Sequence, residues 1–156
     1  MDLTDGKWQV KRFDDLDTRE LYDLLRLRTD VFVVEQECPY PELDGKDTHG
    51  ETIHVWKYGP DMIMAAYLRI LAPGVSFAGV SLGRVAVHRD FRGTGLAHGM
   101  IDKAIELAGI SWPGVKIEIG AQEYLTGFYK SHGFRVTSDP YLEDNIPHID
   151  MALTQT

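Results

Sequence analysis

The sequence predicts a single-domain α/β protein, and three observations support this prediction. The chain has 156 residues, 44% of them hydrophobic, which fits one compact domain over residues 1–156 with its own core. Segments that alternate apolar and polar residues are interleaved with segments of helical periodicity. A strand-like segment also leads through a glycine-rich turn into an amphipathic helix between Val85 and Ala97. The expected element order is β-α-β-β-β-α-β-α-β-β, without an internal repeat.

The first half of the chain is expected to contain five elements. In chain order they are a strand at 8–13, a helix at 18–32, a long loop at 35–51, and a hairpin of strands 53–58 and 62–71. Asp17-Thr18-Arg19-Glu20 forms a capping box before leucines at helical spacing, which predicts the helix. Gly59-Pro60-Asp61 supplies the turn of the hairpin, and two prolines favour the long loop.

The second half alternates strands with helices. In chain order it is expected to contain a strand at 81–88, a helix from Leu96 to Gly109, a strand at 115–119, a short helix at about 123–132, and strands near 134–138 and 148–153. Gly133 suits the left-handed position after the short helix, because it lacks a Cβ. Phe134 should then pack back on Phe128 or Tyr129.

The turn Arg92-Gly93-Thr94-Gly95 is typical of a phosphate-binding loop. The first N–H groups of a helix have no partner within it, and the helix dipole adds positive charge there, so backbone alone can hold a phosphate. The turn is not a P-loop, because no Gly-Lys-Ser/Thr follows. It is not a dinucleotide fingerprint either, since His98 stands in place of the third glycine.

Two motifs in this order resemble those of the GCN5-related N-acetyltransferase (GNAT) superfamily. Arg92 to Ala97 satisfies the superfamily signature Arg/Gln-x-x-Gly-x-Gly/Ala. Gln122, Leu125 and the segment from Phe128 to Phe134 (Phe-Tyr-Lys-Ser-His-Gly-Phe) match a second landmark, with Gln122 where many members have Asn. The resemblance implies an α/β fold, α+β by some schemes, with a mixed central sheet of about six to seven strands and helices on both faces. A splayed pair of parallel strands would bind acetyl-CoA.

Three further segments resemble the ElaA branch of this superfamily. They are residues 28–40, Ala121-Gln122 and residues 141–148. Together with the two motifs, they extend the resemblance over nearly the whole chain. The branch consists of predicted acyltransferases, so the resemblance defines the fold and the co-substrate more closely than the acceptor.

The resemblance implies acetyl-CoA as co-substrate, without a metal. Backbone amides of the glycine turn would hold the pyrophosphate, aided by the Thr94 hydroxyl and the Arg92 charge. The strand before the turn would pair with the pantetheine arm through its main chain, and Gln122 would hydrogen-bond a pantetheine amide. The residues expected to contact the cofactor are Val85, Ala86, Val87, Arg92, Gly93, Thr94, Gly95, Leu96, Ala97, Gln122 and Tyr129.

The implied reaction is acetyl transfer to a primary amine of a small molecule or peptide by direct attack. An amine with a pKa of about 10.4 is neutral in roughly one molecule in 2,500 at pH 7, so a general base should help. Glu118, His54, His148 and Glu35 are the base candidates, although each could be structural. By the family motif, Tyr129 would protonate the leaving thiolate. The expected catalytic set is Tyr129, Glu118 and His148.

Acidic residues are concentrated in the predicted long loop. They are Glu35, Glu37, Glu42, Asp44, Asp47 and Glu51. Such a loop is either an ordinary solvated surface or a surface that attracts a cationic amine. The residues expected to bind the acceptor are Glu35, Gln36, Tyr40, Asp44, His54 and His148.

Composition excludes several other classes. The net charge of −8 argues against nucleic-acid binding. The single cysteine, Cys38, excludes an internal disulfide framework. No apolar run is long enough to span a membrane, and Met1 to Lys7 lacks the features of a signal peptide, so we expect a cytoplasmic protein without a membrane partner. A homodimer remains open. The alternatives to an acetyltransferase are a catalytically silent acyl-CoA sensor and a nucleotide-dependent enzyme.

Overall fold

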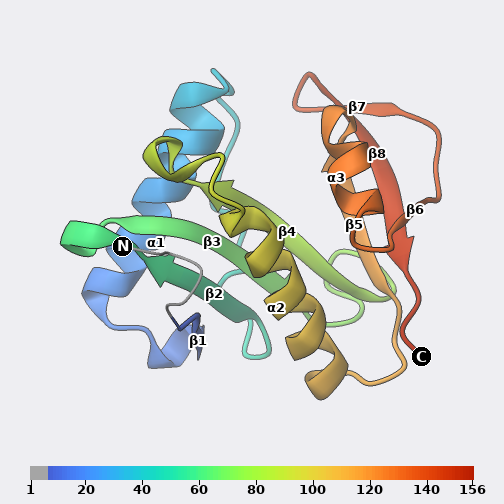
Figure 1. Cartoon of the computed structure of the whole chain (residues 1–156), viewed down its shortest axis with the longest axis horizontal. Helices are drawn as coiled ribbons and strands as arrows, with labels where there is room; N and C mark the ends of the chain where they lie inside the picture. Colours follow the sequence, from blue (N-terminus) through green and yellow to red (C-terminus); the bar gives the residue numbers. More distant parts are fainter. Residues whose placement is uncertain (1–6) are drawn as a thin grey trace.

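The computed structural model describes residues 7–156, and over these residues the chain forms one mixed sheet of eight strands (Figure 1). Residues 1–6, on which most of the signal-peptide prediction depends, lie outside the described part. The strand order is β1-β2-β3-β4-β5-β8-β6, and β7 pairs with β8. The strands are β1 (Gln9–Arg12), β2 (Ile53–Tyr58), β3 (Met64–Leu71), β4 (Val80–Val87), β5 (Ile117–Gln122), β6 (Arg135–Val136), β7 (Tyr141–Glu143) and β8 (Ile146–Leu153).

Within residues 7–156, three α-helices and several short helical turns connect the strands. The α-helices are α1 (Thr18–Arg28), α2 (Leu96–Ser111) and α3 (Thr126–Lys130). The turns are η1 (Phe13–Asp15), the π-helical η2 (Thr29–Glu35), η3 (Pro60–Met62), η4 (Arg89–Phe91) and η5 (Glu123–Leu125). The capping box predicted for α1 is present, because Asp17 accepts from the Glu20 N–H and the Glu20 side chain accepts from the Asp17 N–H. No helix in the described part of the chain is long and apolar enough to cross a membrane.

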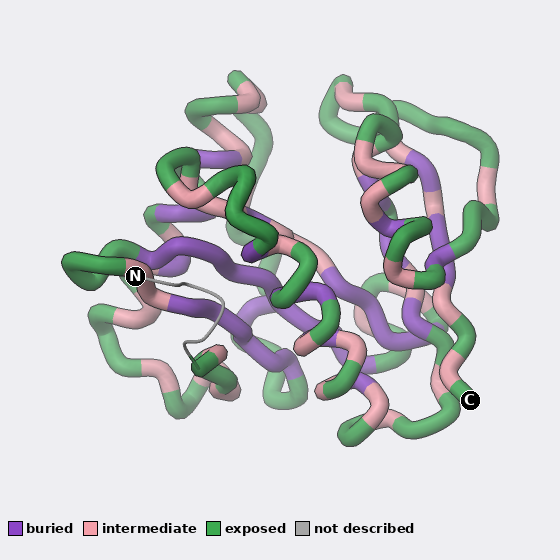
Figure 2. Tube along the Cα trace, viewed as in Figure 1, coloured by how far each residue is buried: buried purple, intermediate pink, exposed green. Residues whose placement is uncertain are grey.

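The helices cover both faces of the sheet, as predicted. Successive residues of β2 show the division, since Val55 belongs to the core beneath α2 and Trp56 to the core beneath α1. Leu24 and Leu27 of α1 and Met100 of α2 are buried in these two cores. Burial is concentrated on the central strands, which Figure 2 shows as a continuous buried layer.

The structure differs from the predicted elements in several places. The eighth strand, β7, lies in a segment predicted to be only a connection; Asp144 and Asn145 both have positive φ, so they close a two-residue hairpin between β7 and β8. The helix predicted over 18–32 is α-helical only to Arg28 and then widens into η2. The strand predicted near 134–138 shortens to Arg135–Val136.

The parallel strands β4 and β5 separate soon after they meet, as the resemblance implied. Their ladder contains the pairs Val80–Ile117 and Ser81–Glu118, and β5 then follows β8 instead. A register shift between β3 and β4, with Arg84 at a φ of 51°, marks a bulge that bends β4 at this point. The two strands therefore diverge, and Figure 1 shows β5, α3 and β8 splayed away from the rest of the sheet.

Candidate active site

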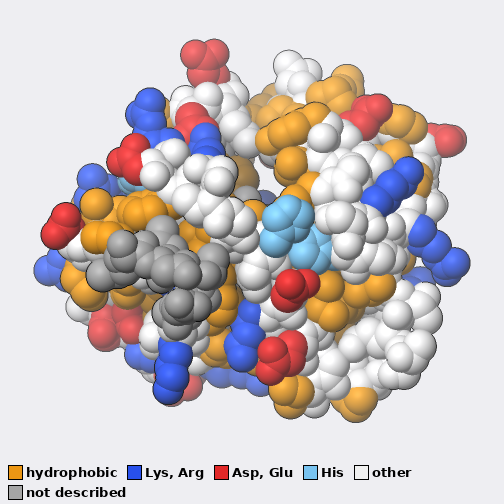
Figure 3. All heavy atoms as spheres, in the orientation of Figure 1, with side chains coloured by type: hydrophobic (Ala, Val, Ile, Leu, Met, Phe, Trp, Pro, Cys, Tyr) orange, Lys and Arg blue, Asp and Glu red, His pale blue; other side chains and the backbone are white. Residues whose placement is uncertain are grey.

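A cleft of about 1040 Å³ opens where β4 and β5 diverge. Its walls are the bent half of β4, the start of α2, the end of β5, and α3. The segment after α1 and the β7–β8 turn line its other side. Figure 3 shows the hollow between the two parts of the molecule. The cleft thus brings together elements that are far apart in the sequence.

The predicted glycine turn lies at this cleft. Gly93 and Gly95 have φ angles of 78° and 80°, which favour glycine, and Gly95 is the N-cap of α2. A Cβ at either position would meet no atom within 4 Å, so the space above the turn is open. The N–H groups of the first turn of α2, which begins at Leu96, have no partners within the helix, and the Gly99 N–H donates to the Gly95 carbonyl. The turn is therefore built to receive an anion through its backbone.

Two side chains of the turn are engaged within the protein. The Thr94 hydroxyl donates to the Phe91 carbonyl at 2.7 Å, which leaves it only as an acceptor. The Arg92 guanidinium donates to the Val87 carbonyl and pairs with Glu35 at 2.7 Å. Hydrogen bonds from Arg92 hold the pKa of the Glu35 carboxyl below its ordinary value. Glu35 is therefore ionised and is poorly suited to act as a base.

The bent part of β4 presents a free edge to the cleft. Beyond Ser81 it has no ladder partner on β5 among the described residues. The side chains of Val85 and Val87 line the cleft, while Ala86 is buried in the core beneath α1. Ala86 could therefore contact a ligand only through its backbone. This edge matches the main-chain pairing expected for a pantetheine arm.

Tyr129 is buried in the wall of the cleft opposite β4. Phe128 and Phe134 contact its ring edge-on, with centroid distances of 5.0 and 5.8 Å. The predicted cap is present, because Gly133 has a φ of 94° and the Phe134 N–H donates to the Tyr129 carbonyl. Burial raises the pKa of the Tyr129 phenol above its ordinary value. Its hydroxyl makes no hydrogen bond with any described residue, so it is a protonated donor without a partner.

Contacts across the cleft connect the segment after α1 to the far wall. The Gln122 amide at the end of β5 donates to the Gln36 side chain at 3.3 Å. Cys38 donates from Sγ to the Asp144 carbonyl at 3.4 Å. Burial, with a contribution from Asp144, raises the pKa of the Cys38 thiol, which argues against a thiolate nucleophile. Tyr40 lines the same side of the cleft and is half-exposed.

His148 lines the cleft and lies opposite Gln122 in the ladder between β5 and β8. Its Nδ1 lies 2.7 Å from the Ile146 carbonyl, which can only accept, so Nδ1 carries a proton. When the ring is neutral, Nε2 therefore has the free lone pair. Nε2 lies 3.7 Å from Glu143, and the Tyr141 ring stacks on the imidazole. Nε2 of the neutral ring can therefore accept a proton.

Two other predicted residues lie elsewhere, so their predicted roles are corrected. Glu118 is not among the residues that line the cleft, and its carboxylate accepts from the Gly79 N–H at 2.7 Å, which secures the closed end of the β4–β5 pair. His54 is fully buried between Tyr67 and the Asp47 carbonyl, and burial lowers its pKa. Both side chains support the fold rather than the acceptor site.

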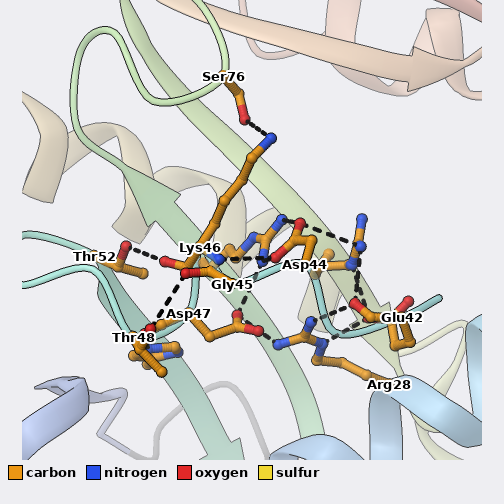
Figure 4. A network of polar contacts seen from close by, with 12 residues as sticks. Arg28, Glu42, Asp44, Gly45, Lys46, Asp47, Thr48, Thr52 and Ser76 are labelled. Carbon is orange, nitrogen blue, oxygen red and sulfur yellow. Dashed lines mark hydrogen bonds and ion pairs between the residues drawn. The ribbon is translucent and has the colours of Figure 1, made fainter.

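The acidic loop is largely neutralised by arginines that sequence reasoning missed. Three carboxylates and three guanidinium groups alternate around a closed ring at distances of 2.5 to 3.5 Å, which we call the arginine–carboxylate ring (Figure 4). Its members, in order of contact, are Arg28, Asp47, Arg69, Asp44, Arg84 and Glu42. The expectation of an open acidic surface is therefore wrong for Asp44, which lines the cleft but is paired with Arg69.

No sequence motif connected these three arginines with one another, because they lie on three separate elements. Arg28 ends α1, while Arg69 and Arg84 lie on the neighbouring strands β3 and β4. Arg28 and Arg69 are almost completely buried. A charged residue in an otherwise apolar strand was the available signal, since such a side chain is buried only when it is paired.

Comparisons with known proteins agree with this geometry. Residues 34–155 match the model of the acetyltransferase (GNAT) domain. Protein ElaA of Escherichia coli is 40% identical over 94% of this chain and 95% of its own length. The crystal structure of E. coli ElaA superposes with a TM-score of 0.88, at 39% identity over 94% of this chain and 98% of that one. An acyl-CoA N-acyltransferase from Pseudomonas aeruginosa superposes with a TM-score of 0.90, at 42% identity over 95% of this chain and 99% of that one. The chain therefore belongs to the GNAT acetyltransferase family, in its ElaA-like branch.

Proposed function

We propose that this protein transfers an acetyl group from acetyl-CoA to a primary amine by direct attack within a ternary complex. The family fold indicates acyl-CoA-dependent acyl transfer. The observation that best supports the finer proposal is the position of Tyr129, a buried phenol without a hydrogen-bond partner among the described residues, in the same cleft as the glycine turn. Such a donor can protonate a leaving thiolate.

The cofactor would extend along the free edge of β4 with its pyrophosphate on the start of α2. Backbone N–H groups at residues 93–98 would hold the phosphate oxygens, because a helix N-terminus favours anions. The main chain around Val85 and Val87 would pair with the pantetheine amides, and Gln122 would contribute a side-chain amide from the other wall. The thioester would then reach the cleft near Tyr129.

The reaction requires two proton movements. A neutral amine attacks the thioester carbonyl, and the tetrahedral intermediate collapses by breaking the carbon–sulfur bond. The departing thiolate takes a proton from the Tyr129 hydroxyl, while the proton lost by the amine passes to His148 Nε2, directly or through a water. Solvent then restores the phenol and the neutral imidazole. No covalent enzyme intermediate is required, in keeping with the thiol state of Cys38.

An acetyl-CoA consumption assay across amines, polyamines, amino sugars and peptides tests this proposal. We expect CoA release that depends on one class of amine. Binding of acetyl-CoA with no turnover on any amine would instead indicate the acyl-CoA sensor. Greater thermal stabilisation by ATP or NAD than by CoA would contradict the cofactor assignment and favour a nucleotide-dependent enzyme.

A further inference from the structure

A chain of three ionisable side chains leads from the protein surface to the glycine turn. His98 belongs to the first turn of α2, directly after the turn, and lines the cleft. Its Nδ1 lies 2.8 Å from Nε2 of His132, and Nδ1 of His132 lies 3.0 Å from the Asp102 carboxylate. Figure 3 shows histidine side chains gathered beside the hollow, between α2 and α3 of Figure 1.

The three members differ in exposure. The side chain of His132 is only 7% exposed, whereas that of Asp102 is 72% exposed. Phe128 lies beside both imidazoles, with ring centroids 4.7 Å from His98 and 5.3 Å from His132. Both rings are thereby held in place. Nε2 of His98 has no partner among the described residues.

The direction of the hydrogen bonds fixes which protons the chain carries. A carboxylate only accepts, so Nδ1 of His132 holds a proton that it donates to Asp102. With both rings neutral, Nε2 of His132 must accept from Nδ1 of His98, and Nε2 of His98 then carries a lone pair. A phosphate oxygen would be repelled by that lone pair.

One added proton changes Nε2 of His98 from an acceptor into a donor. If the proton binds His98, Nε2 gains its hydrogen directly. If it binds His132, that ring donates to Nδ1 of His98, whose own proton then belongs on Nε2. Both arrangements contain the same number of protons and present an N–H at the same position, and Asp102 stabilises the positive charge in either case.

We propose that His98 is a further acyl-CoA-binding residue, which donates from Nε2 to a phosphate of CoA when the His98–His132 pair takes up a proton. His132 and Asp102 act as positioning residues. The inference rests on the proposed function, because it takes CoA as the ligand of the cleft. The two histidines make no hydrogen bond or ion pair with any other ionisable side chain of the described residues. Arg92, the cation of the neighbouring turn, is balanced by Glu35.

Calorimetry of CoA binding at pH 7, in two buffers of different ionisation enthalpy, measures the protons taken up. The wild-type protein should take up a fraction of one proton, and it should bind CoA more tightly at about pH 6 than at about pH 8, because the Nε2 donor requires the added proton. His98→Gln should take up none and bind CoA about tenfold more weakly at pH 6, as expected for the loss of a hydrogen bond to a charged group. Asp102→Asn should reduce the uptake without unfolding the protein, since Asp102 is exposed.

Glu106→Gln is the matched control, because Glu106 is an exposed carboxylate one turn further along α2. It should behave as the wild type. Repeating the titration with 3′-dephospho-CoA identifies the phosphate: uptake that disappears assigns the 3′-phosphate, and uptake that persists assigns the pyrophosphate. If the wild-type protein binds CoA without taking up a proton, this inference is overturned but the proposed function is not. The same holds if His98→Gln binds CoA with the affinity and the proton uptake of the wild type. A wild-type protein that does not bind CoA would overturn the proposed function as well.

Discussion

The arginine–carboxylate ring and the glycine turn both border the cleft, but they use their polar groups in opposite ways. In the ring, three positive and three negative side chains neutralise one another and attach the loop at 42–47 to α1, β3 and β4. In the turn, the first backbone N–H groups of α2 have no side-chain cap, and a Cβ on Gly93 or Gly95 would meet open space. Charge density in the sequence therefore marked a structural support, whereas the region built to bind a ligand contains mostly uncharged residues.

The largest expected effect is a loss of stability when the arginine–carboxylate ring is interrupted by Asp47→Asn. Asp47 pairs with both Arg28 and Arg69, which are buried, so removing its charge leaves each guanidinium group with one carboxylate partner instead of two. We expect the free energy of unfolding, measured with urea, to fall by about 3 kcal/mol. The protein that remains folded should bind acetyl-CoA as before.

Glu37→Gln is the control for this substitution, because Glu37 is an exposed acid of the same loop outside the ring. Its effect should stay within about 0.5 kcal/mol. Equal losses in the two variants would show that the ring contributes no more than any acid of the loop.

A second prediction concerns the stability of the folded protein at acidic pH. Hydrogen bonds from Arg28 lower the pKa of Asp47, and those from Arg69 lower that of Asp44, although burial opposes both shifts. Because the folded pKa values lie below the unfolded ones, the contribution to stability is complete above the unfolded value of about 3.9 and is lost as the pH falls further.

His54 adds a second loss of stability on acidification, which begins at a higher pH than the loss caused by the aspartates. Burial lowers its pKa, so the unfolded chain binds a proton more readily, and stability declines once the pH falls below about 6.5. Urea unfolding between pH 7 and pH 3 should therefore show two successive declines. His54→Gln should remove the first decline and Asp47→Asn should weaken the second. A wild-type stability independent of pH across this range would contradict both assignments.

A third prediction tests the other side of the comparison with a pair of glycines. Gly95 and Gly74 both have positive φ, and a Cβ at either would meet no atom within 4 Å, but only Gly95 lines the cleft. Alanine should cost about 1 kcal/mol of stability at each position. Only Gly95→Ala should weaken acetyl-CoA binding, by about tenfold, as measured by calorimetry. Equal affinities in the two variants would place the phosphate elsewhere.

The smallest expected effect is that of Glu35→Gln. Arg92 and Glu35 are both substantially exposed, so their ion pair is worth at most about 1 kcal/mol. Releasing Arg92 should tighten acetyl-CoA binding by a few fold at low salt, and added salt should remove the gain. Adding Arg92→Gln to Glu35→Gln should abolish the gain in acetyl-CoA affinity. Weaker binding in Glu35→Gln would mean that the ion pair itself shapes the site.

Local signals in the sequence predicted most of the fold. The capping box before α1 and the glycine turn before α2 depend on residues that are adjacent in the chain, and the structure contains both. Strand β7 was missed because the positive φ angles of Asp144 and Asn145 depend on a turn that only the pairing with β8 selects. The π-helical widening after Arg28 likewise has no local cap to mark it.

The candidate site was predicted less completely, because its side chains meet only after folding. The motif residue Tyr129 is in the cleft, but His54 looked like a strand residue available to a ligand and is buried beneath the acidic loop. The partners of that loop come from α1, β3 and β4, which no spacing rule connects. Net charge and charge runs could not show which acids are neutralised.

The turnover of Tyr129→Phe tests the central claim, that this cleft transfers an acyl group with Tyr129 as the acid. It is measured at saturating acetyl-CoA with the best amine of the panel, together with the dissociation constant of acetyl-CoA. We predict a kcat lower by about a hundredfold or more, with acetyl-CoA affinity unchanged within about twofold, since only the donated proton is lost. An unchanged kcat in a variant that still binds acetyl-CoA would contradict the account.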